Sequence, residues 1–142
     1  IPRFITQALA GEFLTVHDDG HQSRDWIYVE DCCQAIDKAL HGDIKKLKGE
    51  VINVGTGKDT SILRVAEMIL DYLGISRDLI ALGGTRPGQV QRHITSTEKA
   101  RKLLDWKAST EFSQGLARTI NWYQENPNWW QQLRKIELSH TL

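Results

Sequence analysis

Two arginines in loops are the residues of this sequence best suited to bind a ligand. Arg24 follows the turn-forming run 18–22, and Arg86 lies in a loop rich in proline and glycine. A guanidinium group donates two parallel, charge-assisted hydrogen bonds to phosphate oxygens. We therefore predict that the two side chains hold a diphosphate. The alternative is that Arg24 pairs with Asp25 or Asp31 and that Arg86 is a solvated surface charge.

A glycine-rich turn, Val-Gly-Thr-Gly at 54–57, follows an apolar run and precedes a helical pattern. This placement is typical of dinucleotide-binding turns. However, Thr60 replaces the third glycine of that motif, and no acidic residue ends a second strand at the expected distance. We interpret the turn as conformational, or as a loop facing a ligand, rather than as a cofactor site.

Groups for covalent or acid–base catalysis are not evident in the sequence. There is no Gly-x-Ser-x-Gly elbow, and none of the three tyrosines is followed four positions later by lysine. The adjacent Cys32 and Cys33 cannot join distant parts of a fold, and the five histidines are scattered. We predict two small buried residues on a helix, no disulfide framework and no metal site.

Helix and strand patterns alternate along the chain, which indicates an α/β fold. Gly11 and Gly74 suit left-handed helix ends, Ser61 suits a helix N-cap, and Thr95 with Glu98 has capping-box spacing. Helices are expected at 2–10, 31–41, 62–73, 95–106 and 112–125, with one more around Trp129 and Trp130. Strands are expected at 12–17, 25–29, 51–54 and 79–82, and a loop at 83–88.

Size and charge describe an ordinary globular domain of 142 residues. Eighteen Lys and Arg balance eighteen Asp and Glu, so we expect no nucleic acid or anionic membrane as a partner. No apolar run approaches the length of a membrane span, and no signal peptide is visible. The reducing cytoplasm is the expected location, because there is no disulfide framework. Since the sequence starts at Ile1, we expect it to be a piece of a longer protein.

Four motifs, in this order and spacing, resemble a known family. They are Gly-His-Gln-Ser-Arg-Asp-Trp-Ile-Tyr-Val-Glu-Asp at 20–31, Asn-Val-Gly-Thr-Gly at 53–57, Arg-Pro-Gly at 86–88 and Leu-Asp-Trp at 104–106. Over nearly its whole length the chain resembles the C-terminal part of the extended short-chain dehydrogenase/reductases. Members of this family are NAD-dependent nucleotide-sugar epimerases and dehydratases. The details are most similar to dTDP-glucose 4,6-dehydratases. A UDP-sugar 4-epimerase portion is the alternative, as is a non-catalytic binding or interaction module.

The resemblance implies a site for a nucleotide-diphosphate sugar. Its residues are, in chain order, Thr15, Val16, His17, Arg24, Asn53, Arg86 and Gln89. The first three would line the base and ribose pocket, the two arginines would hold the diphosphate, Gln89 would face the ribose and Asn53 would brace the pocket. His17, Thr85 and Gln89 depart from the family's usual residues, which leaves the base and the sugar open.

The resemblance also implies which parts lie outside this sequence. The NAD turn and the catalytic Tyr/Lys pair belong to the N-terminal half of the family's enzymes, so the chain alone is expected to be inactive. We expect residues 1–142 to form one domain, incomplete relative to the parent enzyme. Helix 31–41 and strand 51–54 are apolar enough to lie against a larger parallel sheet. An exposed edge and apolar patch there would favour a homo-oligomer or segment exchange.

Overall fold

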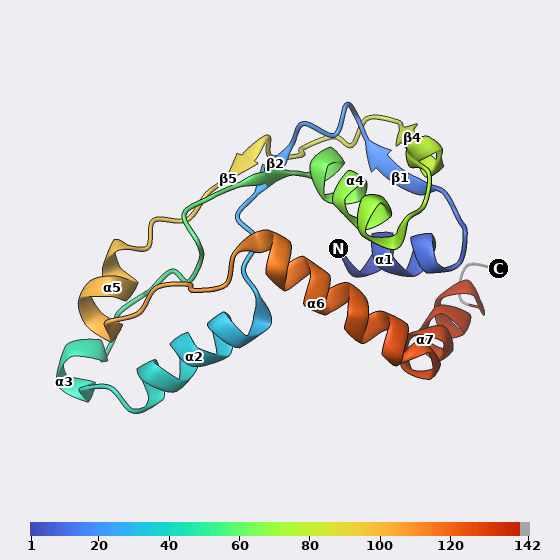
Figure 1. The fold of residues 1–142 in the computed structure, drawn as a ribbon. Coiled ribbons are helices and arrows are strands. Elements are labelled where there is room, and N and C mark those ends of the chain that lie inside the picture. Colours follow the sequence, from blue (N-terminus) through green and yellow to red (C-terminus); the bar gives the residue numbers. More distant parts are fainter. Residues whose placement is uncertain (140–142) are drawn as a thin grey trace.

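Two lobes of unequal size, joined by a short sheet, make up the fold (Figure 1). The computed structural model describes residues 1–139, with side chains up to Arg134. The large lobe contains α1 (Pro2–Leu9), β1 (Leu14–His17), α4 (Ile62–Leu73), η1 (Arg77–Leu79), β4 (Ile80–Gly83), α6 (Phe112–Glu125) and α7 (Pro127–Ser139). The small lobe contains α2 (Val29–Leu40), α3 (Ile44–Leu47) and α5 (Glu98–Leu104). The linking sheet contains β2 (Ser23–Arg24), β3 (Thr60–Ser61) and β5 (Arg92–His93). The α/β fold class is confirmed.

The large lobe follows the sequence pattern closely. In α4, the Ser61 hydroxyl accepts a hydrogen bond from the Arg64 N–H, and Gly74 ends the helix at a φ of 67°. A non-glycine residue is disfavoured at that φ. The apolar face of α4 is fully buried against α1, β1 and α6, where Ile5, Leu14 and Ile120 are also inaccessible. The predicted helices at 2–10, 62–73 and 112–125 are confirmed, as is the strand at 79–82 within one residue.

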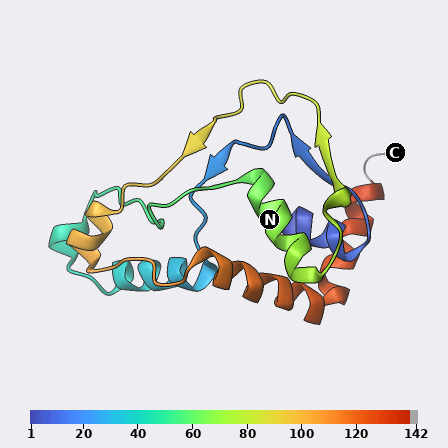
Figure 2. The same cartoon turned by 45° about the horizontal axis from the view of Figure 1, so that its top comes forward.

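Two connections, one after β1 and one after β4, run from the large lobe to the linking sheet, and β3 continues directly into α4 (Figure 2). β1 pairs with β4 in parallel, with Thr15 opposite Ala81 and His17 opposite Gly83. β2 lies between β3, which is antiparallel, and β5, which is parallel. Residues 18–22 and 84–91 therefore leave the same end of one sheet and enter neighbouring strands of the next.

In the small lobe two expectations are wrong. Residues 51–54 form no strand, because no other described strand lies beside them, and Val51 is 78% exposed. Ile52 and Val54 instead contact a small apolar cluster around Trp106. The cysteines are not buried either: Cys33 is exposed and Cys32 half-buried on α2.

The predicted strand 25–29 and the capping box are also wrong in detail. β2 ends at Arg24, and α2 begins at Val29 with Tyr28 as its N-cap. α5 has Thr97 as its N-cap without a side-chain hydrogen bond. The Thr95 N–H, which in a capping box would donate to the Glu98 side chain, donates to the Asp25 carboxylate instead. Residues 25–28 pair with no described strand beyond the end of β2.

Candidate functional site

The surroundings of Arg24 decide between its two interpretations. Arg24 is half-buried, and its guanidinium donates from Nη1 to the main-chain oxygen of Ser23 at 2.7 Å. It forms no ion pair with any described side chain, which means those of residues 1–134. Asp31 is fully buried and accepts hydrogen bonds from Ser109 and Thr110. The alternative in which Arg24 pairs with Asp25 or Asp31 is therefore wrong.

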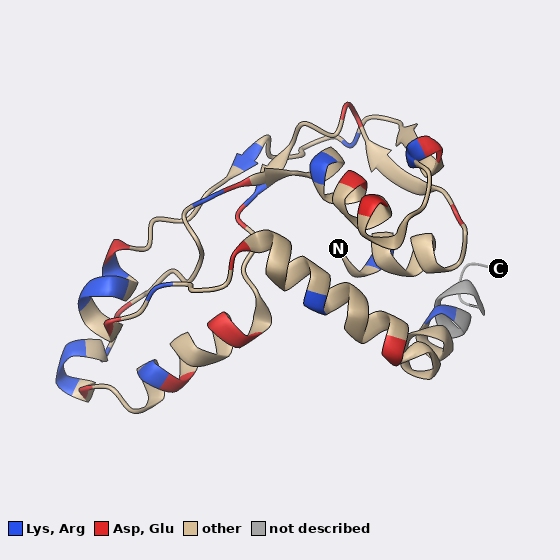
Figure 3. Cartoon of the chain, in the orientation of Figure 1, with Lys and Arg blue, Asp and Glu red and all other residues tan. Residues whose placement is uncertain are grey.

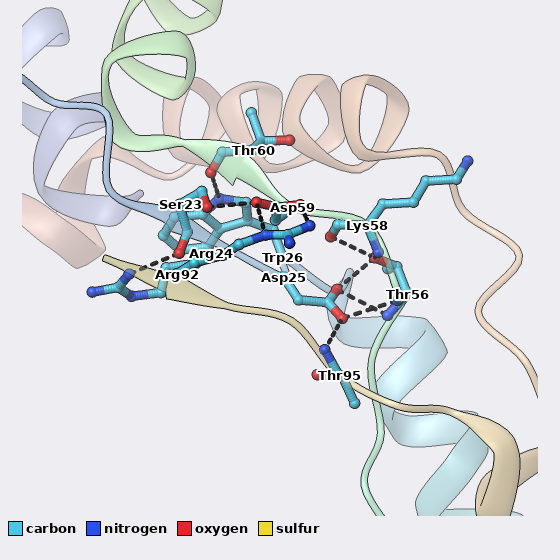
Figure 4. Close-up of polar contacts among 11 residues, drawn as sticks. Ser23, Arg24, Asp25, Trp26, Thr56, Lys58, Asp59, Thr60, Arg92 and Thr95 are labelled. Atoms are coloured by element: carbon cyan, nitrogen blue, oxygen red, sulfur yellow. Dashed lines mark hydrogen bonds and ion pairs between the residues drawn. The ribbon is translucent and has the colours of Figure 1, made fainter. Parts of the chain in front are cut away.

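The side-chain carboxylate of Asp25 lies in the glycine-rich turn at 54–57 (Figure 4). Its Oδ1 accepts from the Thr56 N–H at 2.9 Å and from the Thr56 hydroxyl, and its Oδ2 accepts from Gly57 N–H at 2.9 Å and Thr95 N–H at 3.2 Å. Burial alone would raise the pKa of this carboxyl, but the hydrogen bonds outweigh it and lower the pKa below its ordinary value. A Cβ on Gly55 would lie 2.8 Å from Oδ2, so this position needs glycine.

This arrangement explains the glycine-rich turn without a cofactor. Successive main-chain N–H groups in such a turn form an anion-binding concavity. Here the anion is the protein's own carboxylate, so the N–H groups of Thr56 and Gly57 are not free for a pyrophosphate. The turn thus does not fit NAD, and the interpretation of its glycines as conformational is supported.

A second carboxylate, Asp59, holds the face of the linking sheet on which the Ser23 side chain lies. Arg92 donates to it from Nε at 3.0 Å and from Nη2 at 2.9 Å, and the Ser23 hydroxyl donates to the same carboxylate (Figure 4). The hydrogen bonds from Arg92 and then Ser23 hold the pKa of Asp59 well below its usual range. Because side chains alternate along a strand, Arg24 lies on the other face of β2. The sequence motifs singled out neither Asp59 nor Arg92, which have no distinctive spacing.

The three residues expected to line the base and ribose pocket lie on two different faces of β1, because side chains alternate along a strand. The Val16 side chain is fully buried in the large-lobe core, so at this position the main chain alone can face a ligand. Thr15 and His17 share the opposite face. A Cβ on Gly83 would lie 2.9 Å from Thr15 Cγ2, and His17 Nδ1 lies 3.3 Å from the Gly84 oxygen. Thr15 therefore lies against Gly83 of β4, and His17 lies against the start of the connection 84–91.

The remaining candidates lie on different segments. Arg86 and Gln89 belong to the connection 84–91, where the Gln89 N–H donates to the Arg86 oxygen at 3.3 Å in a turn. Arg86 is exposed and, in the described part of the chain, shares no hydrogen-bond partner with Arg24. Asn53 is exposed in the small lobe and does not lie on the elements that carry the other candidates.

Charge is mixed over the whole molecule. Figure 3 shows Lys and Arg interspersed with Asp and Glu in both lobes. Among the described residues, no group of three or more His, Cys, Asp or Glu is arranged to hold a metal ion. No described helix has the length and apolar character needed to cross a membrane.

Comparison with known proteins identifies the class. The family model described as GDP-mannose 4,6 dehydratase matches residues 1–119. A dTDP-glucose 4,6-dehydratase of Streptomyces niveus is 35% identical over 134 residues, which are 94% of this chain and 39% of that protein. A dTDP-glucose 4,6-dehydratase structure from Streptomyces venezuelae, with NAD bound, has a TM-score of 0.86 at 31% identity, covering 94% of this chain and 40% of the other. A UDP-glucose 4-epimerase structure from Thermotoga maritima, with UDP-glucose, has a TM-score of 0.79 at 26% identity, covering 87% and 38%.

The fold and these matches define the C-terminal portion of an extended short-chain dehydrogenase/reductase. The chain belongs to the GDP-mannose 4,6-dehydratase family of sugar-nucleotide dehydratases and epimerases. It spans about two fifths of the length of the relatives it matches.

Proposed function

We propose that this chain is the nucleotide-diphosphate-sugar-binding portion of an NAD-dependent sugar-nucleotide 4,6-dehydratase of the dTDP-glucose type. The observation that carries the proposal is the state of Arg24. Arg24 is half-buried as a residue, its guanidinium is held by its own main chain, and it forms no ion pair with the side chains described, those of residues 1–134. Such a group keeps donors and charge for the oxygens of a diphosphate.

Two further features support the assignment of the ligand's parts. Thr15 and His17 present one face at the strand end nearest the linking sheet, where a base and ribose would lie. The connection 84–91 enters β5 beside β2, so Arg86 and Gln89 are carried towards the strand of Arg24. Asn53, which lies outside these elements, is assigned at most a bracing role.

In this proposal the chain supplies binding energy and positioning rather than chemistry. Remote diphosphate contacts hold the sugar in place for reaction, and residues 1–142 act as a single unit without activity of their own. Because the glycine-rich turn is occupied by Asp25, we assign NAD to residues outside this sequence. The free cysteines on α2 support a reducing, cytoplasmic location.

The proposal extends to self-association through α2. Val29, Ile36 and Leu40 are all more than half exposed on this helix, and Val51 is exposed near it. An apolar surface of this kind favours association with a second copy or exchange of segments.

Titration calorimetry with dTDP and UDP tests the proposed function. We expect binding that is lost in Arg24→Ala and in Arg86→Ala, and unchanged in Arg64→Ala, an arginine of α4 that pairs with Glu67. A preference for dTDP supports the dehydratase type, whereas a preference for UDP supports the 4-epimerase alternative. No heat with either diphosphate overturns the proposal in favour of a non-catalytic interaction module.

A further inference from the structure

We propose that Asp25 is a positioning residue for Arg24, acting through the main chain that the two residues share. The inference rests on the proposed function, because it concerns how the diphosphate-binding arginine is held. It assigns a role to a carboxylate that touches no ligand itself.

The first argument is that β2 is too short to fix its own position. It has two residues, and its neighbours β3 and β5 have two each. Main-chain hydrogen bonds flank it on both sides: Ser23 N–H donates to the Gln91 oxygen at 2.8 Å and Asp25 N–H to the His93 oxygen at 2.9 Å, next to β5, and Ile62 N–H donates to the Gln22 oxygen at 2.9 Å, next to β3. A strand this short has little cooperative support from its ladder.

The second argument is that Asp25 ties the end of β2 to two other segments. Its carboxylate accepts four hydrogen bonds, three from the turn at Thr56 and Gly57 and one from Thr95, which follows β5. Hydrogen bonds to a charged acceptor are the strong ones in proteins. This side chain therefore holds the main chain at residues 24 and 25, in addition to the hydrogen bond that the Ser23 hydroxyl donates to Asp59.

The third argument is that the Arg24 guanidinium depends on that main chain. Among the described residues, the guanidinium donates its hydrogen bond to the main-chain oxygen of Ser23 at 2.7 Å, within its own strand. Movement of the strand therefore moves the guanidinium with it. The same contacts turn the Asp25 carboxylate into the glycine-rich turn, so that it does not compete with a phosphate for Arg24.

Asp31 provides a matched control. It is also a carboxylate saturated by hydrogen bonds from a loop, with Ser109 and Thr110 as donors, but it holds α2 rather than β2. Asp25→Asn and Asp31→Asn therefore make the same chemical change. Both should lower the thermal stability of the chain, but Asp25→Asn alone should change how it binds a nucleotide.

The experiment measures the dissociation constant of the chain for dTDP by calorimetry, at a temperature where all variants are folded. We expect Asp25→Asn to weaken binding about tenfold and Asp31→Asn to leave it within about twofold. In an Arg24→Lys background, which keeps the charge but not the paired guanidinium donors, Asp25→Asn should weaken binding by much less than tenfold, because coupled residues are not additive. Unchanged binding in Asp25→Asn, or equal weakening in both backgrounds, overturns the inference.

A milder pair covers the case in which Asp25→Asn does not fold. Thr56→Val removes one hydroxyl donor to Asp25, and Ser109→Ala removes one hydroxyl donor to Asp31. We expect weaker dTDP binding in Thr56→Val than in Ser109→Ala, and equal binding contradicts the inference. If the unaltered chain binds neither dTDP nor UDP, the proposed function fails. If it binds and loses binding in Arg24→Ala but not in the Asp25 and Thr56 variants, the positioning role alone fails.

Discussion

The two lobes are stabilised in different ways. Twelve buried residues of the large lobe form one continuous apolar cluster, whereas the cluster of the small lobe has four, centred on Trp106. The small lobe relies on polar ties instead. Asp31 anchors the start of α2 to the loop at Ser109, and the Lys38 ammonium donates to the main-chain oxygens that end α5, at 2.8 Å for Asp105.

This difference shows what each lobe needs from its surroundings. The large lobe packs the apolar faces of α1, α4 and α6 against one another, while Leu82, Trp122 and Trp129 stay exposed. The small lobe buries just two residues of α2, Asp31 and Ala35, and exposes Leu40 at 76%. The shape of the small lobe therefore depends on hydrogen bonds, and part of its apolar surface is not covered by the described residues.

The largest expected effect is in the core of the large lobe. Ile69 is fully buried in α4, so Ile69→Ala removes apolar contacts and leaves a cavity. We expect the free energy of unfolding, measured by urea titration, to fall by about 2–5 kcal/mol. Leu82→Ala, at a position 65% exposed on β4, is the control and should change it by less than about 0.5 kcal/mol. Equal losses in the two variants would contradict the distinction between a packed and an open surface.

A smaller and local effect is expected in Asp31→Asn. The amide keeps one oxygen as an acceptor and turns an NH2 group towards the donors that faced the other oxygen, so at least one of the three hydrogen bonds from Ser109 and Thr110 is lost and the tie at the start of α2 is weakened. We expect the free energy of unfolding to fall by about 2 kcal/mol. Hydrogen exchange should become faster in α2 and α5 and stay unchanged in α4. Faster exchange of α4 to the same extent would show that the lobes unfold as one unit.

How far the sequence predicts the structure also differs between the lobes. The α4 helix was predicted correctly because Ser61, Gly74 and a regular apolar spacing all agree, and its packing partners lie within the same chain. Residues 51–54 are a short apolar run, which is typical of a buried strand, but no described strand lies beside them and they form none. An apolar pattern indicates which residues tend to be buried, but it does not indicate which part of the protein covers them.

The candidate site shows a similar division. Residue type and spacing are enough to propose Arg24 as a ligand-binding residue and to interpret the glycine-rich turn as conformational. The contact that connects them was not: Asp25 meets Thr56 and Gly57 across a gap of more than thirty positions. Adjacent residues of opposite charge suggested an ion pair, whereas the fold gives the carboxylate main-chain donors instead.

Acid should weaken the polar ties before it affects the apolar core. Hydrogen bonds outweigh burial and lower the pKa of both Asp25 and Asp31. A carboxyl with a lowered pKa in the folded state adds stability above the unfolded value of about 3.9, and that stability is lost as the pH falls towards the folded value. As the pH falls below about 4, we expect the free energy of unfolding to decrease, because the carboxyls lose the charge that their hydrogen bonds favour. Tryptophan fluorescence against pH measures it, and Asp31→Asn should flatten the profile. An unaltered profile in that variant would remove Asp31 from the explanation.

The smallest effect on stability, and the sharpest test of the open surface, is expected in Leu40→Glu. Leu40 lies near the end of α2, where its exposed side chain gives up little packing when replaced. The free energy of unfolding should change by no more than about 0.5 kcal/mol. Self-association, followed by sedimentation velocity over a range of concentrations, should nevertheless decrease, because a charge then lies within the apolar face that includes Ile36. Tyr72→Glu, at a residue 48% exposed on α4 of the large lobe, is the control and should leave association unchanged. Equal association in the Leu40 variant and the unaltered chain would show that the α2 face is not the contact surface, and the apolar exposure of the small lobe would then have no role in self-association.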